Sequence, residues 1–320
     1  MENFITDFGN IGMADIARVG GKNASLGELF RALKPEGVGV VDGFAITSDA
    51  YWHLLDQAGL RNKLDALFEK FNSENVEQLA ERGHAARAAI LQTPIPEDLN
   101  QAIIEAYHHL TSRIGRDVEL AVRSSATAED LPEASFAGAA ETFLNVRGPE
   151  NLLRAVHQCF ASLFTDRAIS YRARLGFPQL KVALPVGVMP MVRSDRASSG
   201  VIFTLDTESG FRDVVTVTAS YGLGEFVVQG VVTPDEWLVF KPTLTQGYDA
   251  IVSRRLGSKE VRLVYAQGTR STQHRSEGER RQTPGDGRAS WREEGRREGP
   301  YRWRHAGRRG RKEAGERREA

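Results

Sequence analysis

Two basic residues of this sequence stand beside small residues, in positions where proteins commonly bind phosphate. Arg123 ends an apolar, strand-like run and is followed by Ser, Ser, Ala and Thr. Small side chains let backbone N–H groups approach the oxygens of an anion, and arginine adds a planar, always-charged fork. Lys22 follows the pair Gly20-Gly21 at the start of a helix-like segment, a second position that favours anions. Both residues are candidates for binding a polyanion.

The segment after Arg123 extends the same pattern. It passes through Phe136-Ala-Gly-Ala and then becomes apolar again after Thr142. Its small side chains would let backbone N–H groups approach an anion, and the Thr142 hydroxyl could donate a hydrogen bond.

Each of the two cations also has a plain structural interpretation. Lys22 can be a solvated lysine at a helix end, because Gly-Gly-Lys alone is a weak motif and lacks the spacing of a P-loop. Arg123 can form a salt bridge with one of three nearby carboxylates, which are Glu129, Asp130 and Glu133. From the residues alone, these interpretations remain open beside phosphate binding.

The elements that must position these residues follow from hydrophobic periodicity. Leu26, Leu29, Phe30 and Leu33 share one face of a helix that begins near Lys22. Further helices are predicted over residues 50–71, 76–91, 97–114 and 150–175. After Phe177, runs rich in β-branched residues predict successive strands, over residues 180–192, 197–206, 213–222 and 236–242. Because helices and strands come in blocks, the fold class expected is α+β.

Composition narrows the classes of protein that remain. Hydrophobic residues make up 41% of the 320 residues, and the formal net charge is +0. The first 266 residues are mildly acidic, so we expect no nucleic-acid partner. No apolar stretch approaches the ~20 residues of a membrane helix, and we see no signal peptide. The lone Cys159 lies near the apolar face of its helix, where it should pack as a small hydrophobe, and a cytoplasmic location is expected.

The last part of the chain differs from the rest in its amino-acid composition. From Gln267 to Ala320 there is no Val, Ile, Leu, Met or Phe, and Arg, Gly and Glu dominate. Such a segment buries too little apolar surface to offset its ordering entropy, so we predict a disordered tail. A basic nucleic-acid arm is an alternative, which the interspersed acidic residues disfavour. The abrupt change near Ala266 favours a third hypothesis, a reading-frame slip.

Long blocks of the sequence resemble the N-terminal nucleotide-binding domain of phosphoenolpyruvate synthases (pyruvate, water dikinases), from Met1 to about Ala266. The blocks are GGKNASLGEL, AVRSSATAEDLPEASFAGAAETFLNV, VRSDRASSGVIFTLDTESGF and SYGLGEFVVQGVVTPDEWLVFKPTL. The wider family includes pyruvate phosphate dikinase and rifampin phosphotransferase. The resemblance implies an ATP-grasp fold over residues 1–266, incomplete at its end, and ATP and Mg²⁺ as ligands.

The resemblance also assigns roles to residues. Lys22 and Arg123 would contact the ATP phosphates, and Gly138 and Thr142 would belong to the loop that covers them. Met189 stands where relatives carry a hinge glutamine, so Met189 and Met191 would contact adenine by backbone and apolar packing. Filling of the core is the equal alternative for both methionines.

Carboxylates are the least defined part of the expected site. Glu225 could face the nucleotide, and Asp206 and Glu208 are weak candidates for metal ligands. Carboxylates that bracket a Thr in a turn, as these two do, are more often solvated or capping groups. The family's metal-binding carboxylates would lie past Ala266, and its phosphohistidine and pyruvate-binding domains fall outside these residues.

Three functions follow as expectations. The first is the ATP-binding portion of an enzyme that makes phosphoenolpyruvate from pyruvate, ATP and water through a phosphohistidine, inactive on its own. The second is an antibiotic phosphotransferase of the rifampin type. The third is a non-catalytic fragment that binds a nucleotide at most.

Overall fold

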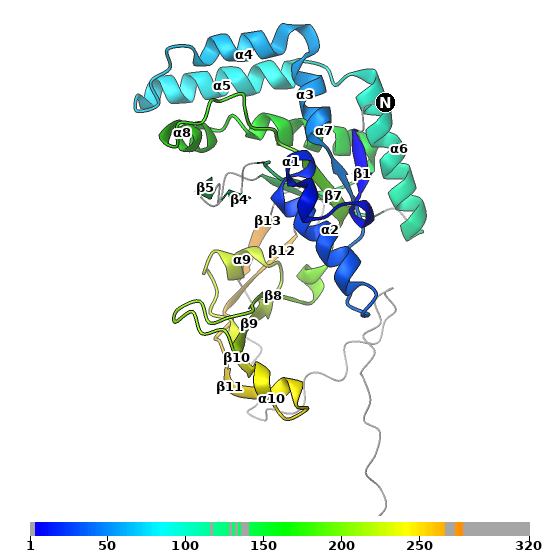
Figure 1. Cartoon of the computed structure of the whole chain (residues 1–320), viewed down its shortest axis with the longest axis vertical. Coiled ribbons are helices and arrows are strands. Elements are labelled where there is room, and N and C mark those ends of the chain that lie inside the picture. The colour runs from blue at the N-terminus through cyan, green and yellow to red at the C-terminus, as the bar shows by residue number, and fades with distance from the viewer. Residues whose placement is uncertain are drawn as a thin grey trace, which may run out of the picture. The chain divides into compact units, whose positions relative to one another are not determined.

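A computed structural model describes residues 4–115, 118–127, 130–131, 134–135, 141–265 and 273–277 of the chain (Figure 1). The chain divides into two units, Met1–Arg280 and Arg281–Ala320. All the described residues belong to the first unit, which contains both helices and sheets, as the sequence predicts.

The N-terminal part of the chain is built around a five-stranded antiparallel sheet. Its strand order is β1-β2-β7-β3-β6, and the strands are β1 (Ile5–Asp7), β2 (Phe44–Ile46), β7 (Val186–Pro190), β3 (Leu120–Ser124) and β6 (Thr142–Val146). Strand β3 therefore lies between β7 and β6, and the connection that follows Arg123 returns directly to the sheet as β6.

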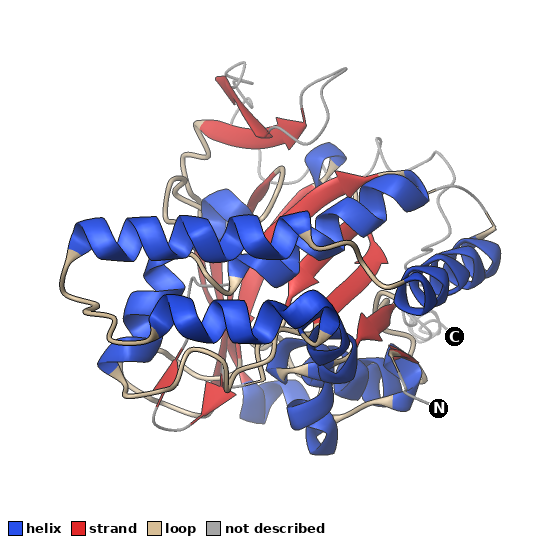
Figure 2. Cartoon of the chain, turned by 90° about the horizontal axis from the view of Figure 1, so that it is seen from above, coloured by secondary structure: helices blue, strands red, loops and turns tan. Residues whose placement is uncertain are grey.

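One face of this sheet holds the main hydrophobic core. Leu120 and Val122 of β3 are fully buried there, with Val186 and Val188 of β7. The covering helices are α3 (Ser48–Leu55), α4 (Leu60–Phe68), α5 (Val76–Gln92), α6 (Glu97–Ile114), α7 (Gly148–Ser162) and α8 (Asp166–Arg174). The long helices run side by side across the strands (Figure 2).

The opposite face is covered by a smaller layer. It consists of two short 3-10 turns, Phe8–Asn10 and Met13–Asp15, and of helices α1 (Ile16–Val19) and α2 (Gly21–Leu33). Phe8, Val19 and Ala24 form a second core cluster there with Met189 of the sheet. This layer places the start of α2, and therefore Lys22, over the sheet face that carries Arg123.

A four-stranded antiparallel sheet follows β7, in the order β11-β10-β9-β8. Its strands are β8 (Ser198–Phe203), β9 (Val214–Tyr221), β10 (Asp235–Phe240) and β11 (Ile251–Arg255), with α9 (Glu225–Val228) and α10 (Lys241–Thr245) between them. Two pairs of strands complete the described residues, namely β4 (Asp130–Leu131) with β5 (Ala134–Ser135), and β12 (Val261–Tyr265) with β13 (Gln273–Glu277). The four strands predicted after Phe177 are confirmed as β7 to β10.

Two of the predicted helices are each divided in the structure. The segment 50–71 is broken between α3 and α4, where Gly59 adopts a left-handed φ of +68°. The segment 150–175 is broken between α7 and α8, where the Thr165 hydroxyl accepts a hydrogen bond from the N–H of Ala168 at 3.4 Å. A glycine with a positive φ and a side-chain cap thus divide helices that the continuous apolar pattern predicted as single ones.

Helix α2 packs through a different face from the one that its leucines suggest. Leu29 is 45% exposed, whereas Gly21, Asn23, Ala24 and Gly27 are buried. Small residues let the helix axis approach the neighbouring turn, since a Cβ at Gly27 would lie 2.5 Å from the Ile11 side chain. Within the described part of the chain, no helix is long and apolar enough to cross a lipid bilayer.

Candidate phosphate-binding site

Strand β3 points Arg123 away from the main core. Successive side chains of a strand alternate between the two faces of the sheet, so Leu120 and Val122 enter the main core while Ala121 and Arg123 face the layer of α1 and α2. Ala121 packs against the second core cluster, beside Met189. Arg123 therefore extends over the sheet face on which helix α2 begins.

The start of α2 is fixed to the end of β3 by close backbone contact. Gly20 has φ +77°, and a Cβ at this position would lie 1.9 Å from the carbonyl oxygen of Ser125. The backbone N–H of Asn23 donates a hydrogen bond to Ser125 Oγ at 3.2 Å. Lys22 lies between these two contacts, so its backbone is held beside the residues that follow Arg123.

A glycine in β7 lets the first turn of α2 lie close to the sheet. Gly187 is the register partner of Arg123, and a Cβ on Gly187 would lie 2.2 Å from Asn23 Oδ1. The first turn of α2 therefore sits directly over the strand next to Arg123. The structure brings Lys22 and Arg123, the two predicted phosphate-binding residues, to the same end of strands β3 and β7, although the Asn23–Ser125 hydrogen bond spans 102 residues of sequence.

The electrostatics of Arg123 suit an anion. Its side chain is half-buried, and this burial lowers the pKa of its guanidinium. Among the residues whose side chains the structure describes, no carboxylate is recorded in a salt bridge with it. The side chains of Glu129, Asp130 and Glu133, the three carboxylates that could pair with it, are outside that description. A half-buried cation gains from an anionic ligand, because the ligand offsets its desolvation.

Of the loop predicted to cover the phosphates, the structure describes only the end. Thr142 opens β6, is exposed, and is the register partner of Arg123 across the sheet. Gly138 lies outside the described residues. The predicted role of Thr142 is compatible with this register, because residues directly opposite in an antiparallel pair project from the same face.

The two methionines have different surroundings. Met189 is only 7% exposed and packs with the second core cluster, which is the core-filling alternative. Met191 is half-buried. Its backbone N–H donates to the Glu119 carbonyl at 2.8 Å, and its sulfur lies 3.7 Å from the Tyr265 hydroxyl. Met191 is thus the better placed of the two to meet a ligand where β7 leads into the second sheet.

A charged cluster beside Met191 was not predicted from the sequence. The Arg193 guanidinium pairs with both carboxylate oxygens of Asp195, at 2.8 and 2.7 Å, and of Glu119, at 3.1 Å each. It lies 5.8 Å from the centre of the Tyr265 ring. The hydrogen bonds from Arg193 hold the pKa of Asp195 below its usual range. Arg-Ser-Asp at residues 193–195 was the available signal, but Glu119 and Tyr265 join only in the fold.

Two of the three candidate carboxylates, those of Glu225 and Asp206, are engaged in local contacts. Glu225 is the first residue of α9 and accepts a hydrogen bond from Gln229 Nε2 at 2.8 Å. Asp206 accepts from the backbone N–H groups of Glu208 and Ser209, at 3.3 Å each, and from the Ser209 hydroxyl. These bonds lower the pKa of Asp206. Asp206 thus shapes its own turn, and the described residues include no cluster of three potential metal ligands.

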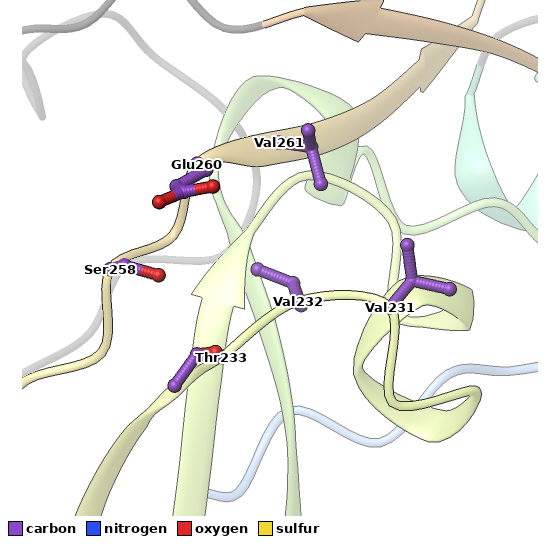
Figure 3. Close-up of a pocket in the computed structure, with 6 residues that line it drawn as sticks. All are labelled: Val231, Val232, Thr233, Ser258, Glu260 and Val261. Carbon is purple, nitrogen blue, oxygen red and sulfur yellow. The ribbon is translucent and has the colours of Figure 1, made fainter.

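A pocket of about 260 Å³ lies in another part of the structure. It is formed where the segments before β10 and before β12 face each other, and Val231, Val232 and Val261 contribute the apolar part of its lining (Figure 3). Thr233, Ser258 and Glu260 complete its lining. It contains none of the residues predicted from the sequence.

The fold and site define a mixed helix-and-sheet domain in which the start of helix α2, with Lys22, lies beside the end of strand β3, with Arg123. Residues 16–285 match the profile of the family described as pyruvate phosphate dikinase, AMP/ATP-binding domain, and the chain belongs to this family. The match reaches beyond Ala266, where the composition changes.

Curated relatives extend the comparison. The chain is 54% identical over 266 residues to a phosphoenolpyruvate synthase of Synechocystis, which covers 82% of this chain and 32% of that protein. It is 53% identical over 259 residues to the phosphoenolpyruvate synthase of Escherichia coli, with 81% and 33% covered. The enzyme of Aquifex aeolicus is 53% identical over 255 residues, with 79% and 30% covered. The chain therefore spans about a third of the length of these relatives.

Proposed function

We propose that this chain is the ATP-binding portion of an enzyme that makes phosphoenolpyruvate from ATP, pyruvate and water, and that its fold is of the ATP-grasp type. One observation carries the proposal. The start of α2, with Lys22, is tied to the end of β3 beside Arg123 through Gly20, Asn23 and Ser125. The family match and the three phosphoenolpyruvate synthases support the same conclusion.

The proposed roles follow from charge and position. Lys22 and Arg123 bind the phosphates of ATP, and the loop through Gly138 to Thr142 covers them. Fixed cations at a transferring phosphoryl group stabilise the charge that develops there without reorganisation. Met191 contacts the adenine, while Met189 supports β7 from the core.

Mg²⁺ accompanies ATP in this proposal, but the described carboxylates fit the ion poorly. The carboxylate oxygens of Asp206 already accept hydrogen bonds from backbone N–H groups of its own turn, and Glu208 is exposed. We assign no step to these residues. We propose residues 1–266 as the domain that binds ATP and residues 267–320 as a tail, of which Gln273–Glu277 pairs with β12 as strand β13.

Calorimetry of ATP binding to the full chain tests the proposed site. Lys22→Ala and Arg123→Ala should each weaken binding by about 1–3 kcal/mol, the value of a charge-assisted contact. The matched controls are Lys34→Ala at the other end of α2 and Arg147→Ala, whose partner is Glu119. They should bind ATP like the parent chain. Unchanged ATP affinity together with a lower melting temperature in Lys22→Ala and Arg123→Ala would show that both residues are structural.

A second assay separates the full activity from nucleotide binding alone. The 320-residue polypeptide, incubated with ATP, Mg²⁺ and pyruvate, should not form phosphoenolpyruvate, because phosphoryl transfer through a histidine needs groups that we assign to none of its residues. Pyruvate-dependent AMP formation above a Lys22→Ala control would overturn this expectation. The same assay with rifampin in place of pyruvate tests the antibiotic phosphotransferase alternative.

A further inference from the structure

A buried asparagine lies next to the proposed phosphate site. Asn23 is fully buried, and its Nδ2 donates a hydrogen bond to the Val19 carbonyl at 2.9 Å. Its Oδ1 has no hydrogen-bond partner among the described residues. Buried acceptors without partners are rare in folded proteins, because such a group has lost its water without a replacement.

The unpaired Oδ1 points at the strand beside Arg123. It occupies the place of a side chain on Gly187, since a Cβ there would be 2.2 Å away. Gly187 and Arg123 are register partners of β7 and β3. Directly opposite Cβ positions on an antiparallel pair are about 4.5–5.5 Å apart and on one face. The Oδ1 of Asn23 and the side chain of Arg123 are thus neighbours on the same face of the sheet.

The guanidinium of Arg123 can supply the hydrogen-bond donor that Oδ1 of Asn23 lacks. A guanidinium carries five N–H donors and no acceptor, so Arg123 can donate to a protein acceptor and to a ligand at the same time. A ligand must offset the cost of ordering the side chains that it contacts. A second, protein-borne acceptor would remove part of that cost.

We propose that Asn23 positions Arg123 for phosphate binding, with Oδ1 accepting a hydrogen bond from the guanidinium when ATP is bound. Gly187 is the residue that makes room for this oxygen. The remaining donors of the fork face the phosphates. The inference rests on the proposed function, since it concerns the same site.

A double-mutant cycle on the full chain, read as ATP affinity by calorimetry, tests this role. Asn23→Ala should weaken ATP binding about tenfold in the parent chain, the size of one hydrogen bond to a charged group. In the Arg123→Ala background it should weaken binding less than about twofold, because the group that it positions is gone. Gly187→Ala, whose Cβ displaces Oδ1, should show the same dependence on Arg123.

Asn151 provides the matched control. In α7 its Nδ2 donates to the Arg147 carbonyl at 2.8 Å, four residues back, as Asn23 does to Val19. Asn151→Ala therefore removes the same kind of helix contact away from Arg123, and it should leave ATP affinity unchanged in both backgrounds. If Asn23→Ala prevents folding, Asn23→Asp retains the size of the side chain. Its carboxylate should hold Arg123 in an ion pair, and so weaken ATP binding only when Arg123 is present.

The outcomes separate the two proposals. An equal loss of affinity from Asn23→Ala in both backgrounds, or no loss in either, would show that Asn23 only supports the helix, and would overturn this inference alone. If Arg123→Ala itself leaves ATP affinity unchanged, the proposed phosphate site fails and this inference fails with it.

Discussion

At the scale of single residues, we expect His157 to make the stability of the folded chain depend on pH. It lies on α7, where its Nε2 donates a hydrogen bond to the Ile90 carbonyl of α5 at 2.8 Å. Burial lowers the pKa of this imidazole, so the folded chain binds its proton less readily than the unfolded chain does. Stability should therefore fall as the pH drops below about 6.5, the usual pKa of histidine.

Urea denaturation at pH 7.5 and pH 5.5 tests this expectation. The parent chain should be less stable at pH 5.5, and His157→Gln, whose amide can still donate to Ile90, should show a smaller difference. His84→Gln is the control, because His84 is exposed on α5 and should retain the parent's pH dependence. A full pH effect in His157→Gln would place its origin in other groups.

Single residues also show what the sequence could and could not predict. The packing of Cys159 is confirmed, because its place on an apolar helix face was visible in the pattern, and its exposed fraction is 0%. The Arg193 cluster was not predicted, because its partner Glu119 is 74 residues away in sequence. Charge pairs between distant segments leave no local period or spacing to detect.

At the scale of elements, the junction of α2 with β3 depends on Gly20. Its φ of +77° with a ψ of 161° is a backbone conformation almost restricted to glycine, and its closeness to the Ser125 carbonyl leaves no room for a side chain. Gly20→Ala should lower the free energy of unfolding by more than about 2 kcal/mol, since strain and a backbone clash add.

Gly37 supplies the matched control for this substitution. It has φ +82°, but a Cβ added there would have no other atom within 4 Å. Gly37→Ala should therefore cost only the left-handed backbone term, about 1–2 kcal/mol. Denaturant titration of both variants measures the difference, and equal losses would argue against a tight helix–strand junction.

Helix and strand prediction succeeded where one pattern ran uninterrupted. Residues 97–114 form a helix with those bounds, from Glu97 to Ile114. Residues 50–71 and 150–175 were each predicted as one helix, because periodicity continues across breaks made by a single glycine or cap. The burial of α2 through small residues was missed, since hydrophobic periodicity records large side chains. The convergence of Lys22 and Arg123 was implied by the family resemblance, and the path through Asn23 and Gly187 came only from the fold.

At the scale of the whole molecule, the boundary near Ala266 remains a prediction. The absence of large aliphatic residues from Gln267 to Ala320 leaves this segment little to bury. Limited proteolysis of the full chain should remove it first and leave a protected fragment near residues 1–266. Mass spectrometry of the fragments identifies the boundary. A protected fragment that extends past Trp303 would contradict a separate tail.

The central claim is that Lys22 and Arg123 bind phosphate, and the most direct test compares ligands that differ only in their phosphates. Affinities of the full chain for adenosine, AMP, ADP and ATP should rise with the number of phosphates, because each adds anionic oxygens within reach of the two cations. Lys22→Ala and Arg123→Ala should reduce that rise and leave adenosine binding unchanged. If either variant instead weakens adenosine and ATP by the same factor, its cation does not act on the phosphates and the account of the site is wrong.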